Sequence, residues 1–207
     1  PSRKMGLVIQ AESHKNELAG IYEMEYDPDT LEYYDQPGPI QLIYPSKNGR
    51  SVTVRHTPDF FVLRSQSMGW EEWKTEAELI KLSEQQPHRY VRGVDETWSC
   101  PPGEAYAQPF GFFYRIRSSA EIDWVFQRNL RFMEDYLRDD CPEVNPSIVT
   151  AVIKLVQEQP GLNLTALRAQ VEGVEPDSLY RLIVTDQIYC DLRAIPLTEP
   201  DRVKVYL

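Results

Sequence analysis

The stretch that decides the fold of this chain reads His56-Thr57-Pro58-Asp59-Phe60-Phe61-Val62-Leu63, then a short polar turn, then Gly69-Trp70-Glu71-Glu72-Trp73-Lys74-Thr75. It predicts two strands joined by a loop. The first strand carries Asp59 at the head of four bulky apolar residues, a run typical of a strand that is buried on both faces.

The second strand combines two charged residues on one face. A period of two places Glu72 and Lys74 on one side and Glu71, Trp73 and Thr75 on the other. With Asp59 at the mouth of the neighbouring strand, these side chains could hold a divalent metal and a phosphate together. Carboxylates are the oxygen ligands that Mg²⁺ prefers, and a bound water can supply the attacking hydroxide for phosphodiester hydrolysis.

Lys74 would orient the attacking water, help to deprotonate it, or offset charge on the phosphorane. The pattern has a simpler reading as well, because Glu and Lys on a strand most often form a solvated face.

A helix is predicted upstream, from about residue 13 to residue 25, with Ser13 as its N-cap. Glu17, Ile21 and Met24 fall at i, i+4 and i+7 and therefore share one apolar stripe. A carboxylate on a buried helix face is costly unless it is paired or binds metal, so Glu17 is a candidate third ligand.

The other elements of the first domain are predicted from apolar patterns and chain breakers. We expect an aromatic, turn-rich connection at 31–39, strands at 40–44, 52–54 and 110–116, a helix at 76–86 and a long helix at 120–138 capped by Ser119. Asn48-Gly49 predicts a hairpin turn between the strands at 40–44 and 52–54. These elements predict an α/β domain, a mixed sheet flanked by helices, with a boundary near residue 143.

Residues 144–207 predict a second, smaller domain. Helices at 146–157, from Thr165 and from Pro176 precede two strands at 188–192 and 203–207, an order that indicates a winged-helix domain. From Asn145 onward the segment has six Lys or Arg residues against eight acids, a net charge of −2. That balance favours docking to a protein, or contact at a few phosphates, over strong independent DNA reading.

Composition limits the classes of function. The net charge is −10 over 207 residues, which argues against broad nonspecific affinity for nucleic acid. No apolar run is long enough to cross a bilayer and the start lacks a signal-peptide pattern, so we expect a cytoplasmic protein with no membrane association. The three cysteines and the three histidines form no ligand pattern.

The chain resembles the TnsA family, the endonuclease subunit of heteromeric, Tn7-like transposases. The resemblance rests on the order of several features: Glu17 eight residues before Glu25, Gln36-Pro37, Thr57-Pro58-Asp59-Phe60, Glu72-Trp73-Lys74 and Arg128-Asn129. It covers about residues 10–140. It implies a restriction-endonuclease-like fold of the PD-(D/E)xK type, in prokaryotes.

The resemblance also implies an activity, a metal and partners. Glu17, Asp59 and Glu72 would hold Mg²⁺, with the backbone carbonyl of Trp73 as a further ligand, Mn²⁺ as a substitute and Lys74 serving the attacking water. Some family members have Gln where Glu72 stands. The enzyme would cut the 5′ ends of the transposon, acting on transposon-end DNA with a TnsB-type DDE transposase and a TnsC-type ATPase regulator.

Two alternatives stay open at this point. A restriction or repair nuclease of the same fold would use the same residues but would cut without partner proteins. A noncatalytic assembly protein would show no metal affinity at Glu17, Asp59 and Glu72. In a nuclease, removing one of the three converging carboxylates should relieve repulsion and stabilise the metal-free fold.

Overall fold

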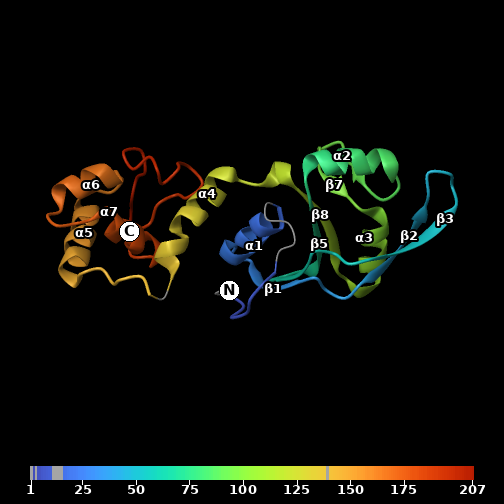
Figure 1. Cartoon of the computed structure of the whole chain (residues 1–207), viewed down its shortest axis with the longest axis horizontal. Coiled ribbons are helices and arrows are strands. Elements are labelled where there is room, and N and C mark those ends of the chain that lie inside the picture. Colours follow the sequence, from blue (N-terminus) through green and yellow to red (C-terminus); the bar gives the residue numbers. More distant parts are fainter. Residues whose placement is uncertain (1, 3, 11–15, 139) are drawn as a thin grey trace. The chain divides into compact units, whose positions relative to one another are not determined.

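The structure is a computed structural model that describes residues 2, 4–10, 16–138 and 140–207. The chain divides into two compact units, residues 1–122 and 123–207 (Figure 1). The division lies earlier than the predicted boundary near residue 143. None of the described helices is long and apolar enough to span a membrane.

Unit 1 is built around a four-stranded mixed sheet with the strand order β1-β4-β5-β8. β4 pairs antiparallel with both β1 and β5, and β5 pairs parallel with β8. The strands of this sheet are β1 (Thr30–Asp35), β4 (Phe60–Arg64), β5 (Met68–Lys74) and β8 (Phe113–Ser118). The mixed sheet that the sequence predicts is confirmed.

One face of the sheet is covered by α1 (Asn16–Tyr26). Met24 packs there with Tyr33, Phe60 and Trp73 in one buried cluster. The helix can approach the sheet closely because it presents Gly20: a Cβ at this position would lie 2.6 Å from Cε2 of Trp73. The predicted cap Ser13 lies outside the described residues.

The opposite face is covered by several short elements. They are a hairpin of β2 (Ile40–Pro45) and β3 (Ser51–His56), the helices α2 (Glu76–Gln85) and α3 (Pro101–Ala107), and a small ribbon of β6 (Val91–Arg92) and β7 (Trp98–Ser99). Leu42, Leu79, Trp70 and Tyr114 belong to the buried cluster of this face. The sheet is therefore covered on both faces, and Glu72 near the end of β5 is fully buried.

The connection predicted at 31–39 differs from the structure. The connection expected at 31–39 contains the strand β1, and a bulge between Thr30 and Glu32 disturbs its alternation of buried and exposed residues. The helix predicted at 76–86 is present as α2, and its buried residue is Leu79.

The long helix expected at 120–138 is interrupted. A 3₁₀ turn at Ser119–Glu121 follows β8, and Asp123 then caps α4 (Trp124–Met133) by accepting hydrogen bonds from the amides of Val125 and Phe126. A second 3₁₀ turn, Glu134–Leu137, follows α4.

Unit 2 contains α4, α5 (Pro146–Glu158), α6 (Leu164–Gln170) and α7 (Pro176–Val184). α6 is capped by Asn163 rather than by Thr165. In the described part of this unit the two expected strands are reduced to isolated bridges, Asn163 with Lys204 and Tyr189 with Tyr206. The three predicted helices are present, but the winged-helix assignment stays a prediction.

α4 belongs to unit 2 because its side chains bond to the C-terminal segment. The amide of Asn129 donates to the carbonyls of Leu192 and Ile195, both at 2.8 Å, and its Oδ1 accepts from the amide of Leu197 at 2.7 Å. These bonds explain why the boundary lies before α4 and not after it.

Candidate active site

The register of the central strands brings Asp59 to Glu72. Phe60 pairs with Glu71, so Asp59, one residue before β4, lies opposite Glu72 at the end of the β4–β5 ladder. The amide of Trp73 donates a hydrogen bond to Oδ2 of Asp59 at 2.6 Å. The backbone of β5 therefore fixes the Asp59 carboxylate.

Lys74 joins the two carboxylates. Its Nζ lies 3.6 Å from Oδ2 of Asp59 and 3.3 Å from Oε1 of Glu72. Glu72 and Lys74 thus share a face of β5, as the period of two predicts, while Trp73 packs in the cluster below α1. The structure brings three of the predicted site residues together.

Glu72 is fully buried and surrounded by donors. Tyr90 donates to its Oε1 at 2.8 Å, Tyr114 donates to its Oε2 at 2.7 Å, and Nε2 of His56 lies 3.2 Å from Oε2. Burial by itself raises the pKa of this carboxyl, but the contacts with His56, Lys74 and Tyr114 outweigh it and hold the pKa well below its usual range. Glu72 is therefore a carboxylate at neutral pH.

The pKa of Asp59 is shifted in the opposite direction from that of Glu72. Burial raises its pKa to about 6, and the negative charges of Glu72 and Glu17 add to that effect against Lys74 and the Trp73 amide. Its carboxyl can exchange a proton near neutral pH.

Glu17 is half-buried near the start of α1. Its charge acts on Asp59, so the structure places it near the other carboxylates. The buried residues of the helix are Asn16, Ala19, Gly20 and Met24. Glu17 therefore lies at the border of the buried face of α1.

Lys74 is held in its charged form. Burial lowers its pKa, but Glu72 and Asp59 raise it more, and the net change is upward. At neutral pH the side chain is an ammonium. It can neutralise or orient a negatively charged group, and it is a poor proton acceptor.

The site has oxygen donors that suit Mg²⁺ but, among its described residues, no preformed group of three ligand side chains. Among residues 2, 4–10, 16–138 and 140–207 there is no group of three His, Cys, Asp or Glu residues that could hold a metal as they stand. The donors nevertheless suit a hard cation, since Asp59, Glu17 and the Trp73 carbonyl all offer oxygen atoms. The raised pKa of Asp59 also reflects negative charge that a cation would neutralise. The donor chemistry therefore fits Mg²⁺.

The sequence did not indicate His56, Tyr90 and Tyr114 as site residues. Each contacts Glu72 from a different part of the chain: the end of β3, the turn after α2, and β8. His56 lies three residues before Asp59, and this spacing is the only sequence signal that could have suggested it. The two tyrosines carry no local signal, because tertiary packing alone brings them to Glu72.

The opposite face of β5 is fixed by a separate set of ion pairs. Oε1 of the buried Glu71 lies 2.8 Å from Nη2 of Arg64, and its Oε2 lies 3.6 Å from Nη1 of Arg117. Arg117 also stacks over Trp73, with its guanidinium carbon 4.6 Å from the ring centroid. These contacts fix β5 on the face that α1 covers, whereas Glu72 and Lys74 lie on the other face, in the candidate site.

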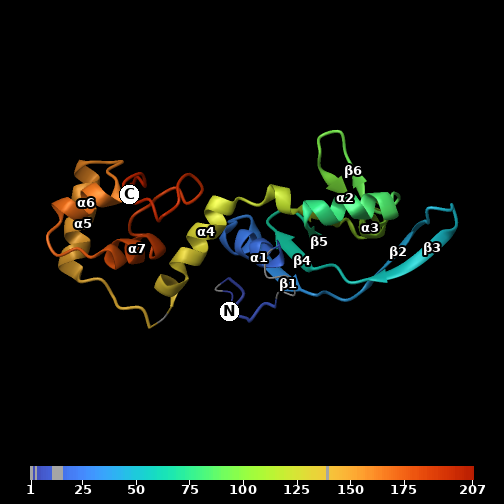
Figure 2. The ribbon, with the colours of Figure 1, turned by 45° about the horizontal axis from the view of Figure 1, so that its top comes forward.

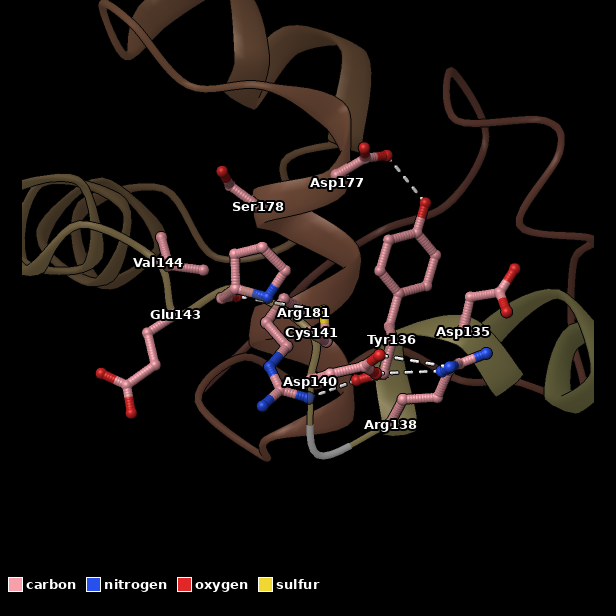
Figure 3. A pocket seen from close by; sticks show the side chains of 11 residues that line it. Asp135, Tyr136, Arg138, Asp140, Cys141, Glu143, Val144, Asp177, Ser178 and Arg181 are labelled. Carbon is pink, nitrogen blue, oxygen red and sulfur yellow. Dashed lines mark hydrogen bonds and ion pairs between the residues drawn. The ribbon is translucent and has the colours of Figure 1, made fainter.

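Unit 2 contains a hollow of about 420 Å³ (Figure 3). Arg138 pairs there with Asp140, Arg181 donates to the carbonyl of Tyr136, and the hydroxyl of Tyr136 donates to Asp177. The cluster of Asp59, Glu72 and Lys74 in unit 1 is the stronger candidate site, because it joins two carboxylates through one ammonium.

Comparison with known families gave one match. Residues 27–119 match a family model described as TnsA-like endonuclease N terminal. The matched range contains Asp59, Glu72 and Lys74, ends close to the boundary of unit 1, and does not include Glu17. No curated protein matches the chain.

Proposed function

We propose, from the premise that residues 27–119 belong to the TnsA-like endonuclease family, that this chain is the DNA endonuclease subunit of a heteromeric transposase. It would cut the strands at the 5′ ends of the transposon during cut-and-paste transposition. The observation that carries the proposal is the convergence of Asp59, Glu72 and Lys74 within the matched domain, with Lys74 Nζ 3.6 Å and 3.3 Å from the two carboxylates.

The metal-binding residues would be Glu17, Asp59, Glu72 and the carbonyl of Trp73. A bound Mg²⁺ would neutralise charge on the scissile phosphate and lower the pKa of a coordinated water. Mn²⁺ should substitute, because it accepts the same oxygen ligands.

The chain's own residues have separable roles. Lys74, as an ammonium, would stabilise the negative charge that develops on the phosphate and orient the attacking water. Asp59, whose carboxylate is fixed by the amide of Trp73, would hold the metal next to that water. Glu72, fixed by two tyrosines and His56, would hold Lys74 in place.

The acidic balance of the chain supports a role for partners. With a net charge of −10, the protein would obtain part of its hold on DNA from a TnsB-type transposase and a TnsC-type ATPase. Unit 2 is the segment we assign to partner or DNA contact.

The test is strand-specific cleavage of a transposon-end duplex by the full chain with both partners and Mg²⁺. Asp59→Ala and Lys74→Ala should each reduce 5′-end cutting at least ~100-fold while 3′-end cutting persists. Asp95→Ala and Lys81→Ala remove the same charges at exposed positions and should cut normally.

Unchanged 5′ cutting in both site variants would refute the catalytic assignment and favour an assembly protein. Cutting by the chain alone, without partners or end sequence, would instead indicate a restriction or repair nuclease.

A further inference from the structure

The charge of the chain is unevenly distributed along its sequence. Residues 36–58 contain no Asp or Glu, the longest such interval in a protein with 32 acidic residues. The same interval contains Lys47, Arg50 and Arg55. A locally basic segment in an acidic protein indicates an anionic partner.

This interval forms the β2–β3 hairpin, which we call the basic hairpin (residues 40–56). It lies at one end of unit 1, with its turn at the periphery (Figures 1 and 2). Its inner face packs into the core through Ile40, Leu42 and Tyr44. The hydroxyl of Tyr44 donates to Gln86 at 3.0 Å and fixes the ribbon against the end of α2.

The outer face of the basic hairpin is exposed. Gln41 pairs with Arg55 and Ile43 pairs with Thr53, and all four residues are exposed. Within the described part of the chain, Arg50 and Arg55 have no acidic partner, and Lys47 contacts only the carbonyl of Glu84, at 3.3 Å. The cationic groups of the hairpin are therefore available to bind an anionic ligand.

The basic hairpin leads directly into the candidate active site. β3 ends at His56, whose Nε2 lies 3.2 Å from Glu72, and Asp59 follows three residues later. A six-residue strand spans roughly 20 Å, which corresponds to about six base pairs of B-DNA. A duplex bound along the ribbon would therefore place a phosphate within reach of the site.

We propose that the basic hairpin binds duplex DNA next to the scissile phosphate, with Arg50 and Arg55 on backbone phosphates. A two-stranded ribbon has the width that the major groove admits, and cations that contact phosphates position a duplex without reading its sequence. The inference rests on the proposed nuclease function, because it specifies how that site holds its substrate.

Binding of the full chain to a fluorescent duplex, measured by anisotropy in EDTA over a salt series, tests the contact. Arg50→Ala/Arg55→Ala should weaken binding at least 10-fold and lower the slope of log affinity against log salt by about two. The control, Lys81→Ala/Arg115→Ala, removes two exposed cations of unit 1 outside the basic hairpin and should bind within 2-fold of wild type. Arg50→Lys/Arg55→Lys should restore the slope.

Equal affinity and slope in the alanine variant and its control would overturn the proposal. So would normal DNA binding combined with loss of stimulation by the transposase partners, which would assign the hairpin to an acidic protein surface. Thermal unfolding of each variant shows whether the fold is retained.

Cleavage with Mg²⁺ and the partners separates failure of this inference from failure of the proposed function. If wild type cuts and the alanine variant has a raised KM with an unchanged kcat, the hairpin is the DNA contact. If wild type cuts and the alanine variant matches it in KM, the inference fails while the nuclease stands. If wild type does not cut but the alanine variant still loses DNA affinity, the DNA contact holds and the nuclease assignment fails.

Discussion

Asp59 and Glu72 face each other across two strands and share Lys74, yet their environments oppose each other. Glu72 is surrounded by donors that stabilise its charge, whereas Asp59 is buried beside other carboxylates. Removing a carboxylate should therefore have opposite effects on stability at the two positions. The sequence predicts that removing any one of the three carboxylates stabilises the metal-free fold. We now expect this for Asp59 and not for Glu72.

Asp59→Asn should stabilise the metal-free protein at pH 8. The folded-state pKa of about 6 lies above the ordinary value of 3.8, so the ionised side chain opposes folding. That cost is absent below pH 4, grows as pH rises to 6, and reaches ~3 kcal/mol above it. Urea unfolding in EDTA from pH 4 to pH 8 measures the difference, with Asp95→Asn as an exposed control. A variant less stable than wild type at pH 8 would contradict the pKa assignment.

Glu72→Gln should destabilise the protein at pH 7 by ~2 kcal/mol. The amide loses the ion pair with Lys74, and its NH2 group must face one of the two tyrosine hydroxyls, Tyr90 or Tyr114, that donate to the carboxylate. Because the folded pKa of Glu72 is lowered, its contribution is complete above pH 4.5 and is lost as pH falls below that value. The same urea series should show the gap closing in acid, and a gap that widens in acid would refute this account.

His56→Ala should reduce cutting ~10- to 100-fold through its contact with Glu72. We expect His56 to act as a positioning residue, because its ring contacts the carboxylate of Glu72. Nicking assays with Mg²⁺ titrations would show kcat falling, while DNA affinity in EDTA stays as in wild type. Equal loss of DNA affinity would instead place His56 in the DNA contact.

At this scale the sequence predicts what lies within a short stretch of chain. Asp59, Glu72 and Lys74 follow from two neighbouring strands and a period of two, and the register bears out their proximity. Glu17 required a helix stripe, and the structure places it near Asp59. Tyr90 and Tyr114 could not be predicted, since their distance from Glu72 depends on how α2, the β6–β7 ribbon and β8 pack.

At the scale of elements, the fit of α1 on the sheet depends on a missing side chain. Gly20→Ala adds a Cβ that would lie 2.6 Å from Cε2 of Trp73, so the helix must shift. The clash should lower the free energy of unfolding by ~1–3 kcal/mol, which exceeds the stabilisation expected from the higher helix propensity of Ala.

Chemical denaturation measures the effect of Gly20→Ala. Gly38→Ala serves as the control, because no atom lies within 4 Å of a Cβ added there. Retained stability in Gly20→Ala would show that Trp73 can move aside.

The element boundaries that the sequence missed have local causes. β1 was hidden by its bulge, which separates the buried Thr30 and Tyr33 by three positions where an alternating strand has two. The predicted helix at 120–138 joined a 3₁₀ turn to α4, because Ile122 reads as part of one apolar stripe. In the structure Ile122 belongs to the core of unit 1, while Asp123 begins a new helix.

At the scale of the whole molecule, the two units should be separable between residues 122 and 123. A fragment of residues 123–207 retains the three hydrogen bonds of Asn129 to the C-terminal segment, and a fragment of 144–207 lacks them. The longer fragment should unfold cooperatively and at a higher temperature. Circular dichroism measures the melting temperature of both fragments. Equal melting temperatures would favour a domain boundary near residue 143.

The middle strand of the site has a consequence for the way the protein opens. β5 lies between β4 and β8, and its residue Glu71 forms ion pairs with Arg64 and Arg117. Its amides should be among the last in unit 1 to exchange their hydrogens for deuterium, because they become accessible only when the unit unfolds as a whole. Glu72 and Lys74 would then keep their arrangement through every partial opening of the fold, so that thermal fluctuation at the edges of the sheet leaves the cutting geometry intact.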